Sequence, residues 1–222
     1  MRYGIIADIH SNLEALEAVL SDLSGKVDQI ICLGDIIGYG PNPNECCEIF
    51  RDKKIPSIAG NHEKGVLGEM SLEWFNPNAS EAVRWTKRQL LPENLEYLKG
   101  LPLTMEYTEF QLVHGSLINP TEEYLNGIFE AMPTFDLMVK PLLFVGHTHQ
   151  PLNLNYKEKE IVNPGSVGQS RDGNPMSSYL VFDSEKKEFN LYRVKYDIEK
   201  VQQKMMIAGL PQFLIDRLTF GR

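Results

Sequence analysis

The sequence predicts an α/β fold of the α+β type, because two different strand patterns follow one another along the chain. In the first half, short apolar runs alternate with stretches of helical periodicity, as expected for parallel strands joined by helices. In the second half, apolar runs come in pairs around short polar turns, as expected for antiparallel hairpins. The 222 residues are enough to bury a substantial core, and we expect them to form one domain, residues 1–222.

Composition and charge limit the classes of function. The contents of 42% hydrophobic and 23% charged residues are ordinary for a globular protein, and no apolar run approaches the roughly 20 residues of a membrane helix. A net charge of −8 repels polyanions, which argues against a stable nucleic-acid complex. An acid interrupts the apolar stretch near the N-terminus, so this stretch does not match a secretory signal sequence. The 3 cysteines cannot all form disulfide bonds with one another, which agrees with a reducing compartment. We therefore expect a cytoplasmic protein without a membrane partner.

The first strand is expected at residues 3–8, where the apolar run YGIIAD ends in an acid. A helix should follow over residues 11–25, because leucines repeat there at helical spacing and Ser11 with Glu14 matches a capping box. QIICLGD and IPSIAGNH repeat the pattern of a strand that runs into a glycine and a polar residue, and NECCEIFRDKK between them favours a helix. Since right-handed crossovers bring the carboxyl ends of parallel strands to one edge, the three polar ends should meet there.

Helices are also expected in the middle of the chain and in its tail. Residues 64–100 are rich in helix formers and contain both tryptophans, which predicts two or three helices. Strand pairs should follow at residues 104–115, 151–166 and 178–194. The tail at about 197–219 carries Met and Leu stripes at helical spacing, which predicts two amphipathic helices that pack against the core.

The histidines are placed unusually. All 5 lie where an apolar run meets a glycine or a polar turn, namely at His10, His62, His114, His147 and His149. Histidines held only by packing would be scattered through element interiors. Residues two apart at the end of a strand point to the same side, so Asp8 and His10 can reach one ion, and the same holds for the two histidines of GHTH.

Two further polar residues extend this group. Asp35 and Asn61 each follow a glycine, and taken alone either one is a turn residue. With them the candidate ligands are two carboxylates, one amide and four imidazoles: Asp8, His10, Asp35, Asn61, His114, His147 and His149. Such a set suits two five- or six-coordinate cations that share one carboxylate. A tetrahedral structural zinc site would instead use cysteines or fewer ligands.

Five short motifs occur in order along the chain: DIH, GD, GNHE, VHG and GHTH. In this order they resemble the calcineurin-like metallophosphoesterase superfamily, and NPGSVGQSRDG after them resembles its small bacterial and archaeal phosphodiesterase-like branch. The resemblance implies a four-layer sandwich of two mixed β-sheets flanked by helices. It also implies two divalent transition-metal ions as cofactors, manganese first, with iron, nickel, cobalt or zinc as alternatives.

The resemblance further implies a role for each residue of the set. One ion would bind Asp8, His10, Asp35 and His149, and the other would bind Asn61, His114, His147 and the shared Asp35. A hydroxide bridging the ions would attack phosphorus in line, and His62 would protonate the leaving oxygen as general acid, oriented by Glu63. The expected function is therefore hydrolysis of a small phosphate-ester substrate, with phosphodiesters ahead of monoesters.

Two alternatives stay open: a phosphomonoesterase or protein phosphatase, and a non-catalytic, metal-stabilised binding protein. Protein phosphatases of this superfamily follow Gly-Asp with an Asp-Arg pair, and here Gly38 and Tyr39 stand in those places. Arg171 is then a candidate phosphate-binding cation, and Tyr39 and Asn61 are further candidates for substrate contact. The plainer interpretations are a solvated Arg171 and a Tyr39 that packs under its loop. The sequence leaves the oligomeric state open.

Overall fold

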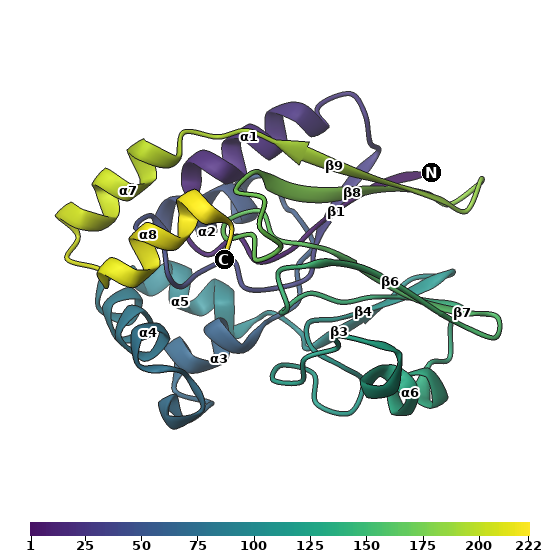
Figure 1. Ribbon diagram of the computed structural model, residues 1–222. Coiled ribbons are helices and arrows are strands. Elements are labelled where there is room, and N and C mark those ends of the chain that lie inside the picture. The colour runs from purple at the N-terminus through teal and green to yellow at the C-terminus, as the bar shows by residue number, and fades with distance from the viewer.

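The computed structural model describes residues 1–222 and contains two mixed β-sheets (Figure 1). The first sheet has four strands, in the spatial order β2 (Gln29–Cys32), β1 (Arg2–Ile6), β8 (Ser177–Asp183) and β9 (Glu188–Val194). β1 and β2 are parallel, whereas β8 is antiparallel to both of its neighbours. The first strand of the chain is therefore held between an early strand and a late one.

The second sheet also contains both parallel and antiparallel strand pairs. It has five strands, in the spatial order β3 (Thr104–Glu106), β4 (Phe110–Val113), β5 (Leu142–Phe144), β7 (Lys159–Pro164) and β6 (Pro151–Tyr156). The central strands β4, β5 and β7 are parallel to one another, and the two edge strands are antiparallel to their neighbours. The three strand pairs expected from the sequence are confirmed as β3–β4, β6–β7 and β8–β9.

Alternate residues of the central strands pack into cores on opposite faces of their sheet. Because both faces are buried, the sequences of these strands are continuous apolar runs. Ile5 of β1 and Phe144 of β5 lie in the core between the two sheets. Ile6 lies on the opposite face of the first sheet, in a core with residues of α1 (Leu13–Leu23) and α2 (Pro43–Asp52). On the outer face of the second sheet, Leu143 packs in a cluster with α6 (Ile128–Leu137). The expected four-layer sandwich is confirmed.

The remaining helices gather at one end of the sheets, opposite the N-terminus in Figure 1. They are α3 (Asn61–Leu67), the 3-10 turn η1 (Leu72–Trp74), α4 (Pro77–Gln89), α5 (Pro92–Lys99), α7 (Ile198–Ile207) and α8 (Gln212–Phe220). None of the helices has the length and apolar character needed to cross a membrane. The carboxyl end of β1 points toward this group, so the loops that follow the parallel strands lie beside it (Figure 1).

The predicted capping box at the start of the first helix was wrong. The N-cap of α1 is Asn12, whose side-chain oxygen accepts a hydrogen bond from the Ala15 amide at 3.1 Å. Ser11 adopts a left-handed backbone with φ 54° and lies outside the helix. An Asx cap competes with a Ser cap on equal terms, so the sequence did not decide between adjacent candidates.

Two other elements differ from expectation. The stretch 55–62, expected to begin as a strand, forms only one bridge, Cys32 with Ser57, and α3 begins directly after Gly60. Helix α6 was not predicted, and Pro133 inside it opposes helix formation. Its buried residues Ala131 and Phe135 belong to the cluster on the outer face of the second sheet, so tertiary packing supports this helix.

Candidate metal centre

The candidate ligands come from loops at the carboxyl ends of parallel strands. Asp8 follows β1, Asp35 follows β2, His114 follows β4, and His147 follows β5. Because the two sheets enclose a common core, these four ends meet at the helix-rich end of the molecule. All seven predicted ligands and His62 are at most 9% exposed. The structure therefore brings the whole predicted set together, although Asn61 and His62 begin a helix and do not end a strand.

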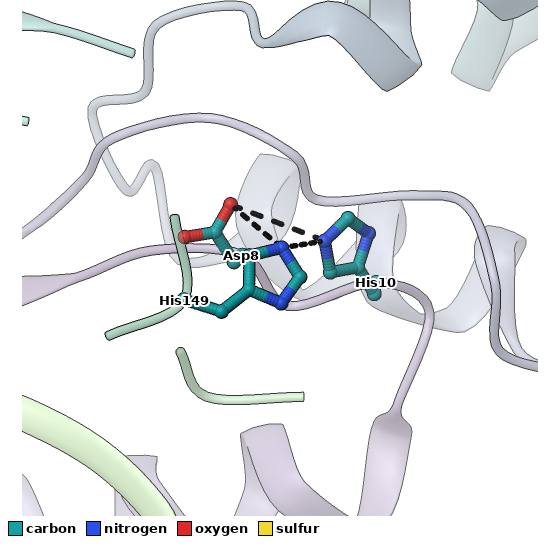
Figure 2. A group of neighbouring side chains, drawn as sticks. All are labelled: Asp8, His10 and His149. Atoms are coloured by element: carbon teal, nitrogen blue, oxygen red, sulfur yellow. Dashed lines mark hydrogen bonds and ion pairs between the residues drawn. The ribbon is translucent and has the colours of Figure 1, made fainter. Parts of the chain in front are cut away.

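One cluster consists of Asp8, His10 and His149 (Figure 2). Asp8 Oδ1 lies 3.6 Å from His149 Nε2 and 3.9 Å from His10 Nε2. The two Nε2 atoms are 2.9 Å apart. One carboxylate and two imidazoles that converge on one point are a typical donor set for a divalent transition metal.

A second cluster consists of Asp35, His114 and His147. His114 Nε2 lies 3.4 Å from Asp35 Oδ2 and 3.3 Å from Asn61 Oδ1. The amide oxygen of Asn61 thus faces the same space as this second cluster.

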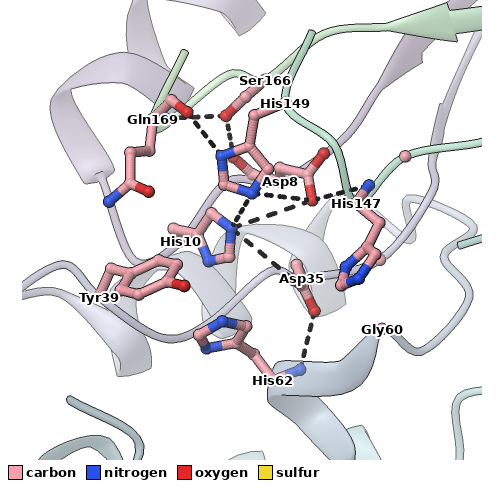
Figure 3. Close-up of polar contacts among 12 residues, drawn as sticks. Asp8, His10, Asp35, Tyr39, Gly60, His62, His147, His149, Ser166 and Gln169 are labelled. Carbon is pink, nitrogen blue, oxygen red and sulfur yellow. Dashed lines mark hydrogen bonds and ion pairs between the residues drawn. The ribbon is translucent and has the colours of Figure 1, made fainter. Parts of the chain in front are cut away.

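Asp35 lies between the two clusters. Its Oδ2 is 3.7 Å from His10 Nε2 and 3.4 Å from His114 Nε2. Its other oxygen, Oδ1, accepts a hydrogen bond from the His62 amide at 2.9 Å (Figure 3). One carboxylate therefore faces both groups of imidazoles while a main-chain hydrogen bond holds its orientation.

Main-chain carbonyls fix the tautomers of three imidazoles. Nδ1 of His10 donates to Ile37 O at 3.2 Å, Nδ1 of His114 donates to Leu33 O at 2.8 Å, and Nδ1 of His149 donates to Gln169 O at 2.6 Å. A carbonyl oxygen can only accept, so each Nδ1 carries a proton. Each Nε2 then points inward, as in histidines that bind metals.

The contact between His10 and His149 shows that these residues fit a cation. Burial holds the pKa of both imidazoles well below the usual value, so both rings are neutral at pH 7. Their Nε2 lone pairs then face each other across 2.9 Å without a proton between them. Asp8 Oδ2 and His147 Nε2 are also buried without a hydrogen-bond partner. A bound cation would relieve the repulsion and satisfy such atoms.

The backbone is strained at the same residues. Asp8, His10, Asp35, His147 and His149 all have left-handed φ angles, between 51° and 68°. Such a conformation costs on the order of 1 kcal/mol for a non-glycine residue, and it clusters at functional sites where surrounding structure enforces it. Main-chain hydrogen bonds do so here: the His10 amide donates to Asp35 O at 3.0 Å, and the Gly168 amide donates to Asp8 O at 2.9 Å.

The two carboxylates have opposite pKa shifts. Burial raises the pKa of Asp8 to about 7. Burial alone would also raise the pKa of Asp35, but the imidazoles of His114, His62 and His10 together hold it well below its usual value. For His114, burial is outweighed by the charge of Asp35, and its pKa is raised to about 9. Asp35 is therefore ionised at neutral pH, and a cation would favour the ionised form of Asp8 as well.

Glu63 does not orient His62, contrary to expectation. Its buried carboxylate accepts hydrogen bonds from three main-chain amides: Gly60 at 2.8 Å, Asp35 at 2.9 Å and Ile37 at 3.2 Å. Burial raises the pKa of Glu63 to about 7. Glu63 instead ties the loop that carries Asp35 to the start of α3. Only its position three residues after Gly60, the N-cap of a helix, hinted at this role.

His62 lies beside the clusters without a side-chain hydrogen bond. Its Nδ1 is buried and has no partner. Its ring lies 4.7 Å from that of His10 and 4.4 Å from that of Tyr39, between ring centroids. Burial lowers the pKa of His62 to about 4. The imidazole also forms a group with His10 and Asp35 that is close enough to share an ion.

The other two substrate-contact candidates lie next to each other. Tyr39 is 6% exposed, and its ring lies 4.6 Å from the ring of His10. Arg171 donates from Nη2 to Gln169 Oε1 at 3.0 Å and to the Tyr39 hydroxyl at 3.4 Å. Arg171 makes no ion pair with a carboxylate, and its Nε is buried without a partner. It is therefore half-buried against Tyr39 beside the centre, and is not a solvated surface arginine.

The four-layer fold and the histidine–carboxylate clusters are features of metallophosphoesterases. The Calcineurin-like phosphoesterase superfamily domain matches residues 1–187. The chain therefore belongs to the calcineurin-like phosphoesterase superfamily, and the predicted resemblance is confirmed.

Three similar proteins illustrate this membership. The Methanocaldococcus jannaschii protein MJ0912 is 40% identical, over 99% of this chain and 98% of its own length. The crystal structure of a metallophosphoesterase from Sphaerobacter thermophilus has a TM-score of 0.91 and 42% identity, over 100% of this chain and 99% of that chain. Phosphodiesterase YfcE of Escherichia coli is 26% identical, over 83% of this chain and 89% of its own length.

Proposed function

We propose that this protein is a dinuclear-metal-dependent hydrolase of phosphate esters that acts preferentially on phosphodiesters. The observation that carries the proposal is the position of Asp35, whose Oδ2 lies 3.7 Å from an imidazole nitrogen of one cluster and 3.4 Å from that of the other. A carboxylate placed in this way suits a ligand shared by two ions.

The proposed ligands follow the two clusters. One cation would be held by Asp8, His10, His149 and Asp35, and the other by Asn61, His114, His147 and Asp35. These nitrogen and oxygen donors suit manganese, and also iron, cobalt, nickel or zinc. When bound, two such cations would lower the pKa of water and offset negative charge on the phosphoryl oxygens.

The chain's own groups would then handle the proton and the phosphate. His62 is neutral at pH 7 because burial lowers its pKa to about 4. An anionic phosphate beside it would raise that pKa, so that the imidazole could carry a proton to the leaving oxygen. Arg171, which has no carboxylate partner, would contribute positive charge to phosphate binding next to Tyr39.

The preference for diesters has one support, and a second observation argues against a protein phosphatase. Phosphodiesterase YfcE is similar to most of this chain. In addition, Gly38 and Tyr39 stand where the superfamily's protein phosphatases have an Asp-Arg pair. A Cβ at Gly38 would lie 2.1 Å from His62 Nδ1, so a carboxylate cannot take that place without displacing the imidazole. The alternative is a phosphomonoesterase, which needs no second ester group on the substrate.

The test is a panel of substrates and metals. Model phosphodiesters, monoesters, cyclic nucleotides and nucleotide polyphosphates would be assayed with the protein loaded with manganese, cobalt, nickel, zinc or iron(II). We expect metal-dependent turnover that is fastest on diesters and that Asp35→Asn abolishes. Faster turnover of monoesters would favour the alternative. Metal-replete protein that turns over no ester would instead be a metal-stabilised binding protein.

A further inference from the structure

A cavity of about 130 Å³ opens directly beside the candidate metal centre. Asn61 and His147 line it on the side of the metal ligands, so the cavity and the centre are continuous. The other walls include four aromatic side chains: Tyr39, Trp74, Phe75 and Tyr124. A closed cavity of about 150 Å³ holds benzene, so this slightly smaller space, which is open at its rim, is of the size of a single six-membered ring.

The aromatic walls come from segments outside the two sheets. Trp74 ends η1 and is 78% exposed, and Tyr124, in the loop between β4 and α6, is 47% exposed. The ring of Tyr124 lies over that of His147, with centroids 3.9 Å apart. Two large aromatic side chains thus stay accessible at the rim of a cavity although burial would stabilise them. Accessible aromatic rings beside a polar centre are typical of sites that bind planar groups.

The charge of the cavity favours an uncharged occupant. No lysine or arginine lines it, and its one ionisable carboxylate belongs to Glu122. A second phosphate or a carboxylate of the substrate would therefore find no counter-charge here. The organic part of a phosphate ester, attached to a phosphate at the metal centre, has no such need.

We propose that this cavity binds a planar, monocyclic group of the substrate, such as a pyrimidine base or an aryl group, by stacking against Trp74 and Tyr124. The proposal rests on the proposed function, because the occupant is positioned by a phosphate at the metal centre. It makes the two aromatic residues determinants of substrate specificity that act through binding of the substrate's ring.

The test measures affinity by calorimetry on metal-loaded protein, with probes that differ only by a ring. Uridine 5′-phosphate is compared with ribose 5-phosphate, and phenyl phosphate with methyl phosphate. Because stacking of a base on an aromatic side chain changes affinity by about 5- to 150-fold, the ring-bearing probe should bind tighter by such a factor. Trp74→Ala and Tyr124→Ala should each reduce this ratio by about 5-fold or more.

Phe129→Ala is the matched control, since Phe129 is an 88% exposed aromatic residue of α6 outside the cavity. It should leave the ratio unchanged. If the ring-bearing probe binds tighter only in the nucleotide pair, the occupant is a base. If it binds tighter only in the phenyl pair, the occupant is an aryl group. Equal affinities within both pairs, or a ratio that survives both alanine variants, overturn the proposal. If diesters are still hydrolysed in that case, only the specificity assignment has failed; loss of all phosphate binding and turnover would overturn the proposed function too.

Discussion

Gly38 lies directly against the imidazole of His62. A Cβ built on Gly38 would stand 2.1 Å from His62 Nδ1 and 2.8 Å from its Cγ, and Gly38 has a φ of +95°. Both the space and the backbone conformation therefore require glycine. A side chain at position 38 would occupy space that the imidazole of His62 now fills, so glycine at this position allows the imidazole to lie where it does.

Gly38→Ala should therefore displace His62 without removing a ligand. Because a misplacement of about 1 Å in a catalytic group can cost about 100-fold in rate, turnover of a diester should fall by about that factor while the metal content stays at the wild-type level. Gly25→Ala is the control, since Gly25 has a φ of +74° and no atom within 4 Å of its added Cβ. It introduces the backbone strain alone. Full activity in Gly38→Ala would show that the position of His62 does not matter to the reaction.

The shared carboxylate can be tested by counting metal ions. Asp35 faces both clusters, whereas His149 belongs only to the one with Asp8 and His10. Asp35→Asn should therefore lose more bound metal than His149→Asn, which should empty about one of two sites. Elemental analysis after dialysis against a fixed free-metal concentration gives both numbers. If the two variants retain the same metal as the wild type, Asp35 is not a shared ligand.

Much of the centre could be predicted because its residues are local to short motifs. Asp8 and His10 are two residues apart, as are His147 and His149, and each pair adjoins an apolar strand. Parallel strands bring such ends together whatever connects them. The motifs therefore predicted which residues would meet. They did not predict the strained left-handed φ angles of these residues, which depend on hydrogen bonds to loops as distant as that of Gly168.

The features that the sequence did not predict depend on long-range packing. Helix α6 forms against the second sheet despite Pro133, and no local signal overrides a proline. Glu63 was assigned to the neighbouring His62, but its carboxylate turns back to the amide of Asp35, 28 residues away. The aromatic cavity joins Trp74 to Tyr124, whose segments become neighbours only in the folded chain.

Metal removal should lower the melting temperature. Cations that bind only the folded state stabilise it by mass action, by about 4 kcal/mol per site at 1,000 times the dissociation constant. For a chain of this size, about 1 kcal/mol corresponds to roughly 2–4 °C. Chelation should therefore lower the melting temperature by about 10 °C or more, and added manganese should restore it. A melting temperature that is unchanged after verified removal of metal would argue against a site built in the folded state.

The ion pair between α1 and α7 predicts a pH-dependent stability. Lys204 Nζ lies 2.6 Å from Glu14 Oε1, and Lys200 Nζ lies 3.2 Å from it. Burial alone would raise the pKa of Glu14, but the hydrogen bonds from both lysines outweigh it, so the pKa lies below its ordinary value of 4.5. A depressed carboxyl pKa contributes stability above the unfolded value, and this contribution is lost as pH falls through the folded value.

Glu14→Gln should therefore destabilise the protein at pH 7 by about 1 kcal/mol, a modest value because both lysines are partly exposed. The difference from the wild type should shrink as the pH falls below 4.5, the ordinary pKa of the glutamate. Urea unfolding at pH 7, 5 and 3 measures it. Glu17→Gln is the control, because Glu17 lies on the same helix, is exposed and makes no ion pair within 4.0 Å. A difference that does not depend on pH would mean that Glu14 acts through packing and not through its charge.

The variant His62→Asn distinguishes two roles for His62, general acid and metal ligand. If His62 donates a proton to the leaving group, the variant should keep its metal and lose rate according to how much the leaving group needs that proton. A nitrophenolate departs readily as an anion, whereas an alkoxide must be protonated as it leaves. General acid catalysis is worth about 100- to 10,000-fold, so the loss should approach the upper end for an alkyl or nucleoside diester and be distinctly smaller for a nitrophenyl diester. Measuring both substrates on one preparation cancels errors in enzyme concentration and metal loading.

Two other outcomes would assign His62 differently. The imidazole lies close enough to His10 and Asp35 to share an ion with them, so a loss of bound metal in His62→Asn would make it a ligand. A metal-replete variant that loses the same factor on both substrates would show that His62 does not act mainly as the acid. Its imidazole would then position the phosphate, a role that fits a group whose pKa of about 4 keeps it neutral at pH 7, because a neutral imidazole still donates one hydrogen bond.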